Sequence, residues 1–386
     1  MSMKRISIML GLLLICMTGT HPFTLNGEAV EESLPPTMQV RLLETTDLHA
    51  HMMDDLYDKR EPTVEYGLVR TASLIKQARR EVPNTLLFDN GDLLQGNALA
   101  DYVATKKGLA PGEIHPVYQA MNLLKYDAAT FGNHEFNYGL EFLNDAIEEA
   151  NFPYVNANIY VNDRNSLDID DINYYNPYII LKRTMIDSNG KKHKLKIGVL
   201  GLVTPLIMYW DKGKLIGKIK VKNIAKTAEN FIPIMKQKGA DIIIALAHSG
   251  LESGISANNN IENTIYPLSK VEGIDAILYG HTHHIFPDEN RTFTVDGVDT
   301  RKGTINGVQA VQAGRWGSHL GIIDLQLEKI NGKWKVVNSQ SFTRAISKKI
   351  KGKSYPLVKP NQTILNAVKH IHRETLQYLK EKGRAR

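Results

Sequence analysis

The sequence predicts an α/β protein, and three observations lead to that fold class. Short apolar runs with the length of buried strands alternate with longer segments in which apolar residues recur at helical spacing. Several of these runs end in aspartate, asparagine or histidine, and ligands gather at the carboxyl ends of strands in open α/β sheets. The chain has 386 residues, 42% hydrophobic and 23% charged, which suffices for one large α/β domain with additions or for two domains.

The first half of the chain is predicted to alternate strands with helices. Apolar residues at Leu68, Ala72 and Ile75 form one stripe of a helix that Pro83 ends. Residues 162–176 are rich in Asn and Asp and are predicted to form a loop. The predicted strands are 39–46, 85–88, 127–131 and 153–158, and the predicted helices are 66–81, 115–124 and 140–150.

The second half is predicted to add three buried strands, a helix, further β-structure and a final helix. Pro233 is expected to kink the helix in the middle of this half. The basic segment 348–353 is interpreted as a solvated surface or linker, so no nucleic-acid polymer is expected as a partner. The predicted strands are 195–202, 241–247, 274–279, 308–312, 320–327 and 334–337, and the predicted helices are 222–238 and 361 to near the chain end.

The N-terminus has the pattern of a secretory signal peptide. Lys4 and Arg5 precede the apolar run 6–17, which is too short for a membrane span. Residues 1–30 are therefore predicted to be a signal peptide and polar leader, cleaved somewhere between 18 and 30, with lipidation of Cys16 as the second choice. The mature protein is expected to be exported and free of stable membrane insertion. Because Cys16 is the single cysteine, a metal would have to be held by oxygen and imidazole nitrogen.

The segment 131–139 is the focus of the prediction. It joins the predicted strand 127–131 to the predicted helix 140–150 through Gly132, Asn133 and His134. Adjacent side chains on an extended backbone point in opposite directions, so Asn133 and His134 are expected to have different tasks. One would bind a metal while the other faces substrate, a division of labour that two-metal phosphate chemistry needs. The alternative is an ordinary turn that happens to contain Asn and His.

Five elements end in residues able to bind metal, and together they supply seven potential ligands. Each piece alone is more often a surface or structural feature, but five in one chain favour a site. Two carboxylates, one amide and four imidazoles are too many for one tetrahedral ion and suit two divalent ions with a bridging carboxylate, for which Asp92 is the candidate. Residues two apart on an extended backbone point the same way, so Asp47 with His49, and His281 with His283, are each expected to face the site together. The other ligands are Asp92, Asn133 and His248.

These motifs resemble those of the calcineurin-like metallophosphoesterases of the 5′-nucleotidase group. Within the group, the stretches 44–49, 114–118, 132–140 and 313–321 look most like the bacterial 2′,3′-cyclic-nucleotide 2′-phosphodiesterase/3′-nucleotidases. The resemblance runs from about residue 38 to the C-terminus. The motifs that match in chain order are Asp47-Leu48-His49, Gly91-Asp92, Gly132-Asn133-His134-Glu135, His248 and Gly280-His281-Thr282-His283.

The resemblance implies a four-layer α-β-β-α metallophosphoesterase sandwich followed by a C-terminal linker helix. Residues 38–345 would form the metallophosphoesterase domain, and 346–386 the linker and helix. Proteins of this group usually carry a second, nucleoside-binding domain beyond that helix, which is expected to be absent from this chain. Either a truncated form or loose specificity would follow.

The resemblance also implies a role for each site residue. One ion would be held by Asp47, His49, Asp92 and His283. The other would be held by Asp92, Asn133, His248 and His281. His134 would be the catalytic residue, with Asn133 helping to take up charge on the transferring phosphoryl group. The ions could be Mn, Co, Zn, Fe or Ni, because oxygen and imidazole ligands do not select among them.

The expected function is hydrolysis of nucleotide phosphoesters by a hydroxide that the two metals activate. The favoured substrates are 2′,3′-cyclic nucleotides, converted to 3′-nucleotides and then to nucleosides. Where related 5′-nucleotidases often place an aspartate three residues after the catalytic histidine, this chain has Asn137. The alternatives are a 5′-nucleotidase or nucleotide-sugar hydrolase on the same site, or an inactive secreted nucleotide-binding protein. The sequence does not indicate an oligomeric state.

Overall fold

The computed structural model describes residues 36–59, 61–110, 112–165, 167, 170–252 and 261–383. The predicted signal peptide and polar leader, residues 1–30 with Cys16, therefore lie outside the described residues. None of the helices within the described ranges combines the length and the hydropathy that a membrane-spanning segment needs.

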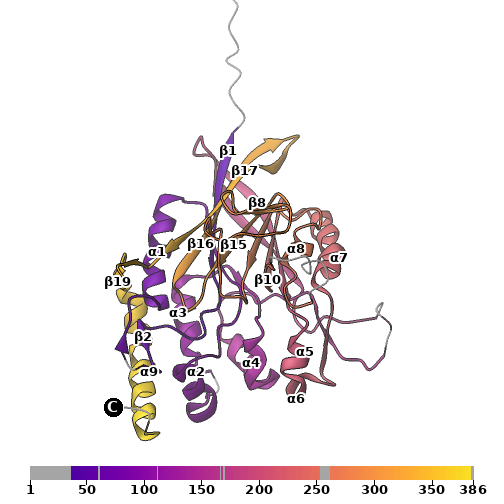
Figure 1. The fold of residues 1–386 in the computed structure, drawn as a ribbon. Helices are drawn as coiled ribbons and strands as arrows, with labels where there is room; N and C mark the ends of the chain where they lie inside the picture. The colour runs from indigo at the N-terminus through magenta and orange to yellow at the C-terminus, as the bar shows by residue number, and fades with distance from the viewer. Residues whose placement is uncertain are drawn as a thin grey trace, which may run out of the picture. The chain divides into compact units, whose positions relative to one another are not determined.

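Two large mixed sheets form the centre of the described residues (Figure 1). The first has the order β17-β16-β1-β4-β5, in which β1, β4 and β5 run parallel. The second has the order β13-β14-β15-β11-β10-β8-β7, with β12 paired to β15, and β8, β10, β11 and β15 run parallel. The first sheet consists of β1 (Thr37–Thr45), β4 (Thr85–Asp89), β5 (Ala128–Ala129), β16 (His319–Ile330) and β17 (Lys333–Ala345). The second consists of β7 (Tyr178–Ile186), β8 (Lys192–Val203), β10 (Ile242–His248), β11 (Ala276–Tyr279), β12 (Ile285–Phe286), β13 (Val298–Asp299), β14 (Thr304–Ile305) and β15 (Val308–Ala313).

Helices cover the outer faces of both sheets. Figure 1 shows α1 and α9 on one side and α7 on the other. The helices are α1 (Leu68–Glu81), α2 (Ala98–Tyr102), α3 (Pro116–Leu124), α4 (Leu140–Glu148), α5 (Ile207–Trp210), α6 (Lys212–Leu215), α7 (Ile224–Gln237), α8 (Ile265–Leu268) and α9 (Gln362–Glu381), with the π-helix η1 (Val103–Lys107) and the 3₁₀-helix η2 (His134–Tyr138). Small ladders pair β2 (Asp55–Leu56) with β3 (Glu61–Pro62), β6 (Ile159–Val161) with β9 (Ile219–Val221), and β18 (Ser347–Ile350) with β19 (Lys353–Pro356).

Three apolar clusters define four layers. Leu42 of β1 and Ile244 of β10 belong to the cluster between the two sheets. The next residue of β1, Leu43, enters the cluster beneath α1, α3 and α9, and the preceding residue of β10, Ile243, enters the cluster beneath α7 and α8. Successive side chains of a strand point to opposite faces, so strands buried on both faces show the continuous apolar runs of the sequence. The predicted α-β-β-α sandwich is confirmed.

Most predicted elements are present, with three departures. Residues 153–158 are not a strand: Tyr154 makes only an isolated bridge to Ala129, and Asn156 Oδ1 accepts the backbone N–H groups of Asn158 and Ile159, which turns the chain. The prediction also missed β7, an edge strand paired with β8. The predicted strand 127–131 is shorter than expected, because regular pairing covers only β5.

Residues 346–383 contain the β18–β19 hairpin followed by α9. The side chains of Ile364, Val368, Ile371 and Leu379 enter the apolar cluster shared with α1 and α3. Helix α9 also lies against α2. The basic segment interpreted as a solvated surface is thus the hairpin, and its lysines at 348, 349 and 351 are exposed.

Helix α3 begins at a buried histidine, which leads to a prediction about acid stability. His115 is 0% exposed, and its Nδ1 accepts the backbone N–H of Val117 at 3.2 Å. Burial, helped by the charge of Lys107, lowers the pKa of His115 from 6.5 to about 3. Between these values the unfolded chain binds a proton that the folded chain does not, so stability falls as the pH decreases from 6.5 towards 3.

His115→Asn keeps an N-capping side chain and removes this titration. We expect the variant to lose less stability than the parent on going from neutral pH to about pH 5, by on the order of 1 kcal/mol per pH unit below 6.5. Urea unfolding at both pH values measures the difference. His51 and His319 have pKa values lowered by burial to about 3 and about 4, so part of the slope should remain. His370→Asn is the control, because the His370 side chain is 83% exposed. An unchanged slope in His115→Asn would contradict the assignment.

Candidate metal centre

The predicted ligands come together where parallel strands of both sheets end. Asp47 follows β1, Asp92 follows β4, Asn133 follows β5, His248 ends β10 and His281 follows β11. Hydrogen bonds link the ends of the two sheets: Asn90 Nδ2 donates to the carbonyl of Ala247 at 3.2 Å, and the backbone N–H of His281 lies 3.2 Å from both carboxylate oxygens of Asp47. The shared strand-end edge predicted from the sequence is therefore present.

One group of side chains surrounds a point beside Asp47. The Nε2 atoms of His49 and His283 are 3.1 Å apart, and His283 Nε2 is 3.4 Å from Asp47 Oδ1. Asp92 Oδ2 lies 3.8 Å from His49 Nε2. These separations are close to the spacing of ligand atoms around one small cation, so the residues of the first predicted set could hold an ion.

A second group converges on the other side of Asp92. His248 Nε2 lies 3.1 Å from Asp92 Oδ2, and His281 Nδ1 lies 2.9 Å from Asn133 Oδ1. Ligand atoms of Asp92, His248 and His281 all lie within 4.8 Å of one another. Asp92 stands between the two groups, where a bridging carboxylate would be needed, and its role as the bridge remains a prediction.

Three of the histidines have their tautomers set by backbone or carboxylate acceptors. His49 Nδ1 is 2.7 Å from the carbonyl of Gln95, and His248 Nδ1 is 2.8 Å from the carbonyl of Asn90. His281 uses the opposite nitrogen, since its Nε2 is 2.9 Å from Glu262 Oε1. An acceptor requires the facing nitrogen to carry a proton, so in the neutral form of each ring the unprotonated nitrogen points inwards, as in many metal sites. At His283 the neighbour of Nδ1 is the guanidinium of Arg315 at 3.3 Å, which cannot accept.

The ligand side chains interact poorly with one another and are suited to surrounding cations. His49 presents a lone pair to Asp92 and to the Nε2 of His283, an arrangement that is favourable only with a positive charge between them. His248 Nε2 is fully buried and makes no hydrogen bond of acceptable geometry. Burial disfavours charge on both partners, yet Asp92 raises the pKa of His248 to about 10 and His248 holds the pKa of Asp92 far below its usual value. The carboxylates thus attract any cation available.

Backbone strain is concentrated in these residues. The φ angles of five of the seven are positive: Asp47 51°, His49 45°, Asp92 56°, His281 76° and His283 58°. The left-handed region costs a non-glycine residue of order 1–3 kcal/mol, and such strain clusters at functional sites. The prediction that the Asp47–His49 and His281–His283 pairs point together from extended backbone is therefore wrong in its reason, although each pair does face the site.

Two glycines let the loops after β4 and β5 touch. A Cβ on Gly91 would lie 2.2 Å from the backbone nitrogen of Gly132, and Gly91 has a φ of 91°. A Cβ on Gly132 would lie 2.2 Å from Asp92 Oδ1. Glycine is required at both positions, because a side chain at either one would collide with the facing loop.

Glu135 fastens the same two loops. Its buried carboxylate accepts the backbone N–H groups of Asp92 at 2.7 Å, Leu93 at 2.5 Å, Leu94 at 3.0 Å and Gly132 at 2.6 Å. These bonds neutralise part of the charge of a side chain that is 0% exposed. Glu135 therefore fixes the position of Asp92, a role that the sequence analysis did not assign.

Asn133 and His134 diverge, as predicted, but from helical rather than extended backbone. Asn133 has φ −75° and ψ −30° and precedes η2. Its side chain faces His281, whereas His134 Nδ1 is 2.6 Å from Asn137 Oδ1. The backbone N–H of His134 donates to Asp92 Oδ1 at 2.7 Å, and the rings of His134 and His49 are 5.1 Å apart. His134 thus borders the candidate metal centre.

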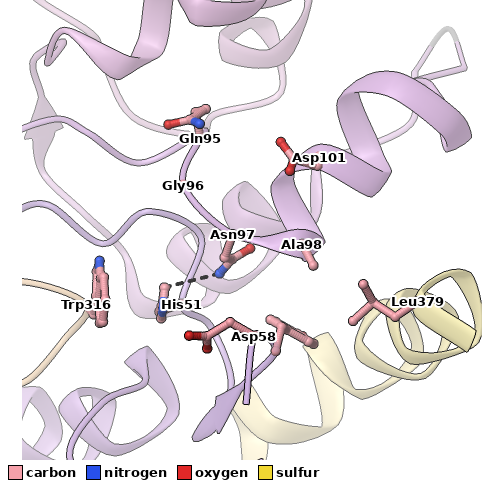
Figure 2. A pocket seen from close by; sticks show the side chains of 10 residues that line it. His51, Asp58, Gln95, Gly96, Asn97, Ala98, Asp101, Trp316 and Leu379 are labelled. Atoms are coloured by element: carbon pink, nitrogen blue, oxygen red, sulfur yellow. Dashed lines mark hydrogen bonds between the residues drawn. The ribbon is translucent and has the colours of Figure 1, made fainter. Parts of the chain in front are cut away.

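Figure 2 shows a cavity of about 500 Å³, which opens next to the centre because its lining residue Gln95 bonds to His49 through its carbonyl group. Its wall includes His51, whose ring stacks on Trp316 with a centroid distance of 4.4 Å. The Nδ1 atom of His51 lies 3.2 Å from Asn97 Nδ2. Asp58 and Asp101 also line it. Carboxylates repel anions, so a substrate phosphate is expected at the metal ligands rather than in this cavity.

Several further residues, not predicted from the sequence, support the site. Glu262 orients His281, and Trp210 stacks on the His281 ring at 5.6 Å. Asp211 contacts Asn137, the partner of His134. Glu135 could have been suspected from its place beside His134. The others lie far from their partners in the sequence, and no local pattern indicates those contacts.

The site and the sandwich define the class of protein. Residues 40–284, more than half of the chain, match the family model described as calcineurin-like phosphoesterase. The chain therefore belongs to the calcineurin-like phosphoesterase family, whose members use divalent metals.

Particular relatives narrow the comparison. The chain is 46% identical over 344 residues to the 2′,3′-cyclic-nucleotide 2′-phosphodiesterase/3′-nucleotidase of Salmonella typhimurium, covering 89% of this chain and 51% of that protein. It is 44% identical over 355 residues to the trifunctional nucleotide phosphoesterase protein YfkN of Bacillus subtilis, covering 91% of this chain and 23% of that protein. The chain thus spans about half the length of the first relative and less of the second.

Solved structures agree on the fold. The crystal structure of calcineurin-like phosphoesterase YfkN from Bacillus subtilis superposes with a TM-score of 0.81 at 43% identity, covering 89% of this chain and 100% of that one. A 5′-nucleotidase precursor from Thermus thermophilus gives a TM-score of 0.60 at 19% identity and covers 88% of this chain and 59% of that one, which supports the fold alone.

Proposed function

We propose that this chain hydrolyses nucleotide phosphoesters, with 2′,3′-cyclic nucleotides and the resulting 3′-nucleotides as substrates. Addition of water to phosphorus breaks the bond to the 2′ oxygen and leaves a 3′-nucleotide. A second addition releases phosphate and the nucleoside. The observation that carries the proposal is the convergence of two carboxylates, one amide and four imidazoles beside His134. The names of the relatives that are 44–46% identical support the choice of substrate.

The proposed ligand sets are those implied by the sequence. Asp47, His49, Asp92 and His283 hold one divalent ion, and Asp92, Asn133, His248 and His281 hold the other. When bound, the ions supply positive charge that lowers the pKa of water and stabilises the phosphoryl oxygens. Mn, Co, Zn, Fe and Ni are all compatible with these ligand types.

The remaining chemistry belongs to protein groups around the ions. His134 stands beside His49 with its Nδ1 bonded to Asn137, so its Nε2 is left to contact a phosphoryl or leaving oxygen. Glu135 and the left-handed backbone of Asp92 hold the ligands before substrate arrives, so little reorganisation is required during the reaction.

A substrate panel tests this function. The purified chain, with its metal content determined, is assayed with 2′,3′-cyclic AMP, 3′-AMP and 5′-AMP before and after chelation. We expect the first two to be hydrolysed, activity to be lost on chelation, and re-addition of one of the five metals to restore it. Preference for 5′-AMP would favour a 5′-nucleotidase instead. A folded, metal-loaded chain inactive on all three would contradict the proposal.

Export and domain organisation complete the proposal. Residues 1–30 act as a signal peptide and polar leader, 38–345 form the phosphoesterase domain, and 346–386 form a linker and C-terminal helix. Sequencing the N-terminus of the protein recovered outside the cytoplasm tests the first point, because a cut between residues 18 and 30 is expected. An unprocessed N-terminus would contradict export by this route.

A further inference from the structure

His134 is connected through Asn137 to a carboxylate on a different part of the chain. His134 Nδ1 is 2.6 Å from Asn137 Oδ1, and Asn137 Nδ2 donates to Asp211 Oδ2 at 2.8 Å. His134 and Asn137 share the 3₁₀-helix η2, whereas Asp211 lies 74 positions later between α5 and α6. We infer that Asp211 is a positioning residue that acts through Asn137 to fix the tautomer and orientation of the His134 ring. This inference deepens the proposed function and rests on it.

The order of donors and acceptors allows only one arrangement of the hydrogen bonds from His134 through Asn137 to Asp211. An ionised carboxylate can only accept, so Asp211 must face the NH₂ group of Asn137 rather than its oxygen. The amide oxygen then faces His134, and because it also only accepts, His134 Nδ1 must carry a proton. Nε2 is thereby left for the reacting groups. Without Asp211 the Asn137 amide could turn over and present its NH₂ to the ring, which would favour the other tautomer.

The surroundings of Asp211 suit this task. Its side chain is only 6% exposed, so solvent competes little for its hydrogen bonds. Lys214 Nζ lies 3.2 Å from Asp211 Oδ1 and also donates to the backbone carbonyl of Asn137. The ammonium group offsets the buried negative charge and ties α6 to η2, which holds Asp211 and Asn137 in register.

The Asp211 contact gives Asn137 a role as a neutral link between His134 and a carboxylate. An aspartate at that position would place a negative charge directly against the imidazole. Asn137 instead keeps one neutral group between His134 and the carboxylate, so the ring is oriented without a charged contact at Nδ1. The orienting carboxylate is therefore still present, one residue further along the hydrogen-bond chain.

A double-mutant cycle tests this inference against a purely structural role. Asp211→Asn nearly preserves the shape of the side chain and removes the obligate acceptor. We expect kcat for the best nucleotide substrate to fall by about 10- to 100-fold with KM nearly unchanged, because orientation matters most in the transition state. In the His134→Ala background the same change should alter kcat by less than about twofold. Equal losses in both backgrounds would make Asp211 an anchor of the fold and overturn the inference.

Asn137→Leu and Asp101→Asn complete the set. Asn137→Leu removes the middle group of the hydrogen-bonded series His134–Asn137–Asp211. It should lower kcat by the same factor as Asp211→Asn, and combining the two changes should cause no further decrease. If Asp211→Asn fails to fold, this variant carries the test. Asp101 accepts the Tyr138 hydroxyl at 2.7 Å, so Asp101→Asn removes a carboxylate contact to η2 that does not reach the His134 ring. It should keep kcat within about twofold.

A spectroscopic measurement separates this inference from the proposed function. Side-chain ¹⁵N chemical shifts of His134 distinguish a protonated from an unprotonated Nδ1 in the metal-loaded protein. We expect the Nδ1–H form in the parent and in Asp101→Asn, and a mixture or the Nε2–H form in Asp211→Asn. If the parent hydrolyses no phosphoester, the proposed function fails while this readout still decides the role of Asp211. The same tautomer in the parent and in Asp211→Asn would overturn the inference.

Discussion

Replacing His134 by alanine is expected to lower kcat for the best nucleotide substrate by about 10²- to 10⁴-fold, with the metal content unchanged. His134 lies outside both proposed ligand sets, and its ring faces Asn137 and His49. The contact that His134 makes with the centre through its backbone, the N–H bond to Asp92 Oδ1, remains in alanine. The variant should therefore bind both ions and lack a group that stabilises the transition state. Steady-state kinetics with elemental analysis of the same samples measures both quantities.

The control for this experiment is a histidine remote from the site. His370 lies on the exposed face of α9 beside Glu374, so His370→Ala should retain normal kinetics and metal content. Near-normal turnover of His134→Ala would remove the catalytic assignment. Loss of metal from that variant would instead identify His134 as a metal ligand. The ligand atoms of His134, His49 and Asp92 lie within 4.8 Å of one another, so the experiment has to distinguish the two outcomes.

Asp92→Asn is expected to abolish activity by removing metals rather than by altering the chemistry. Asp92 is 1% exposed and stands between the two groups of imidazoles, 3.1 Å from His248 Nε2 and 3.8 Å from His49 Nε2. Asparagine has nearly the same shape as aspartate, but it removes one of the two carboxylate charges of the ligand set, those of Asp47 and Asp92. It also replaces one of the two oxygen ligands of residue 92 with an NH₂ group. We expect fewer than about one ion per chain and activity reduced by at least about 10⁴-fold.

Asp89→Asn is the matched control, since Asp89 ends β4 only three residues earlier and is also buried. Burial raises the pKa of Asp89 to about 8, so its carboxyl group is largely protonated at neutral pH and an amide resembles it. This variant should keep both ions and most activity. Full metal occupancy in Asp92→Asn, with a fold unchanged by circular dichroism, would exclude Asp92 as the bridge.

The residues of the candidate site were accessible from sequence because their signals are local. Each potential ligand stands beside a strand end, and glycine at Gly91, Gly132 or Gly280 marks three of those turns. Parallel strands place such ends on one edge of each sheet, so the grouping of ligands within each sheet could be expected, whereas the meeting of the two edges depends on how the sheets pack. The four layers were expected from the resemblance to the metallophosphoesterases, and the continuous apolar runs agree with them, since such runs require burial on both faces.

Two elements were missed or misplaced. The edge strand β7, which pairs with β8, was not predicted although its residues Tyr178, Ile179 and Ile180 favour β-structure. The apolar segment 153–158 contains Asn156, whose side chain turns the chain where hydrophobicity suggested a strand. The Asn156 bonds span only two and three residues, so this turn is a local effect that outweighs the apolar pattern of the segment.

The sequence by itself determined which side chains are present at the strand ends and therefore which chemistry is possible. Only the tertiary structure decided which nitrogen of each histidine faces inwards, that five of the ligand residues adopt left-handed backbone, and that Asp211 stands behind Asn137. The physical reason is the distance along the sequence over which each effect acts. Residue type and strand periodicity act over a few positions, whereas a hydrogen bond between residues 74 positions apart exists only after both sheets and the helices around them have packed.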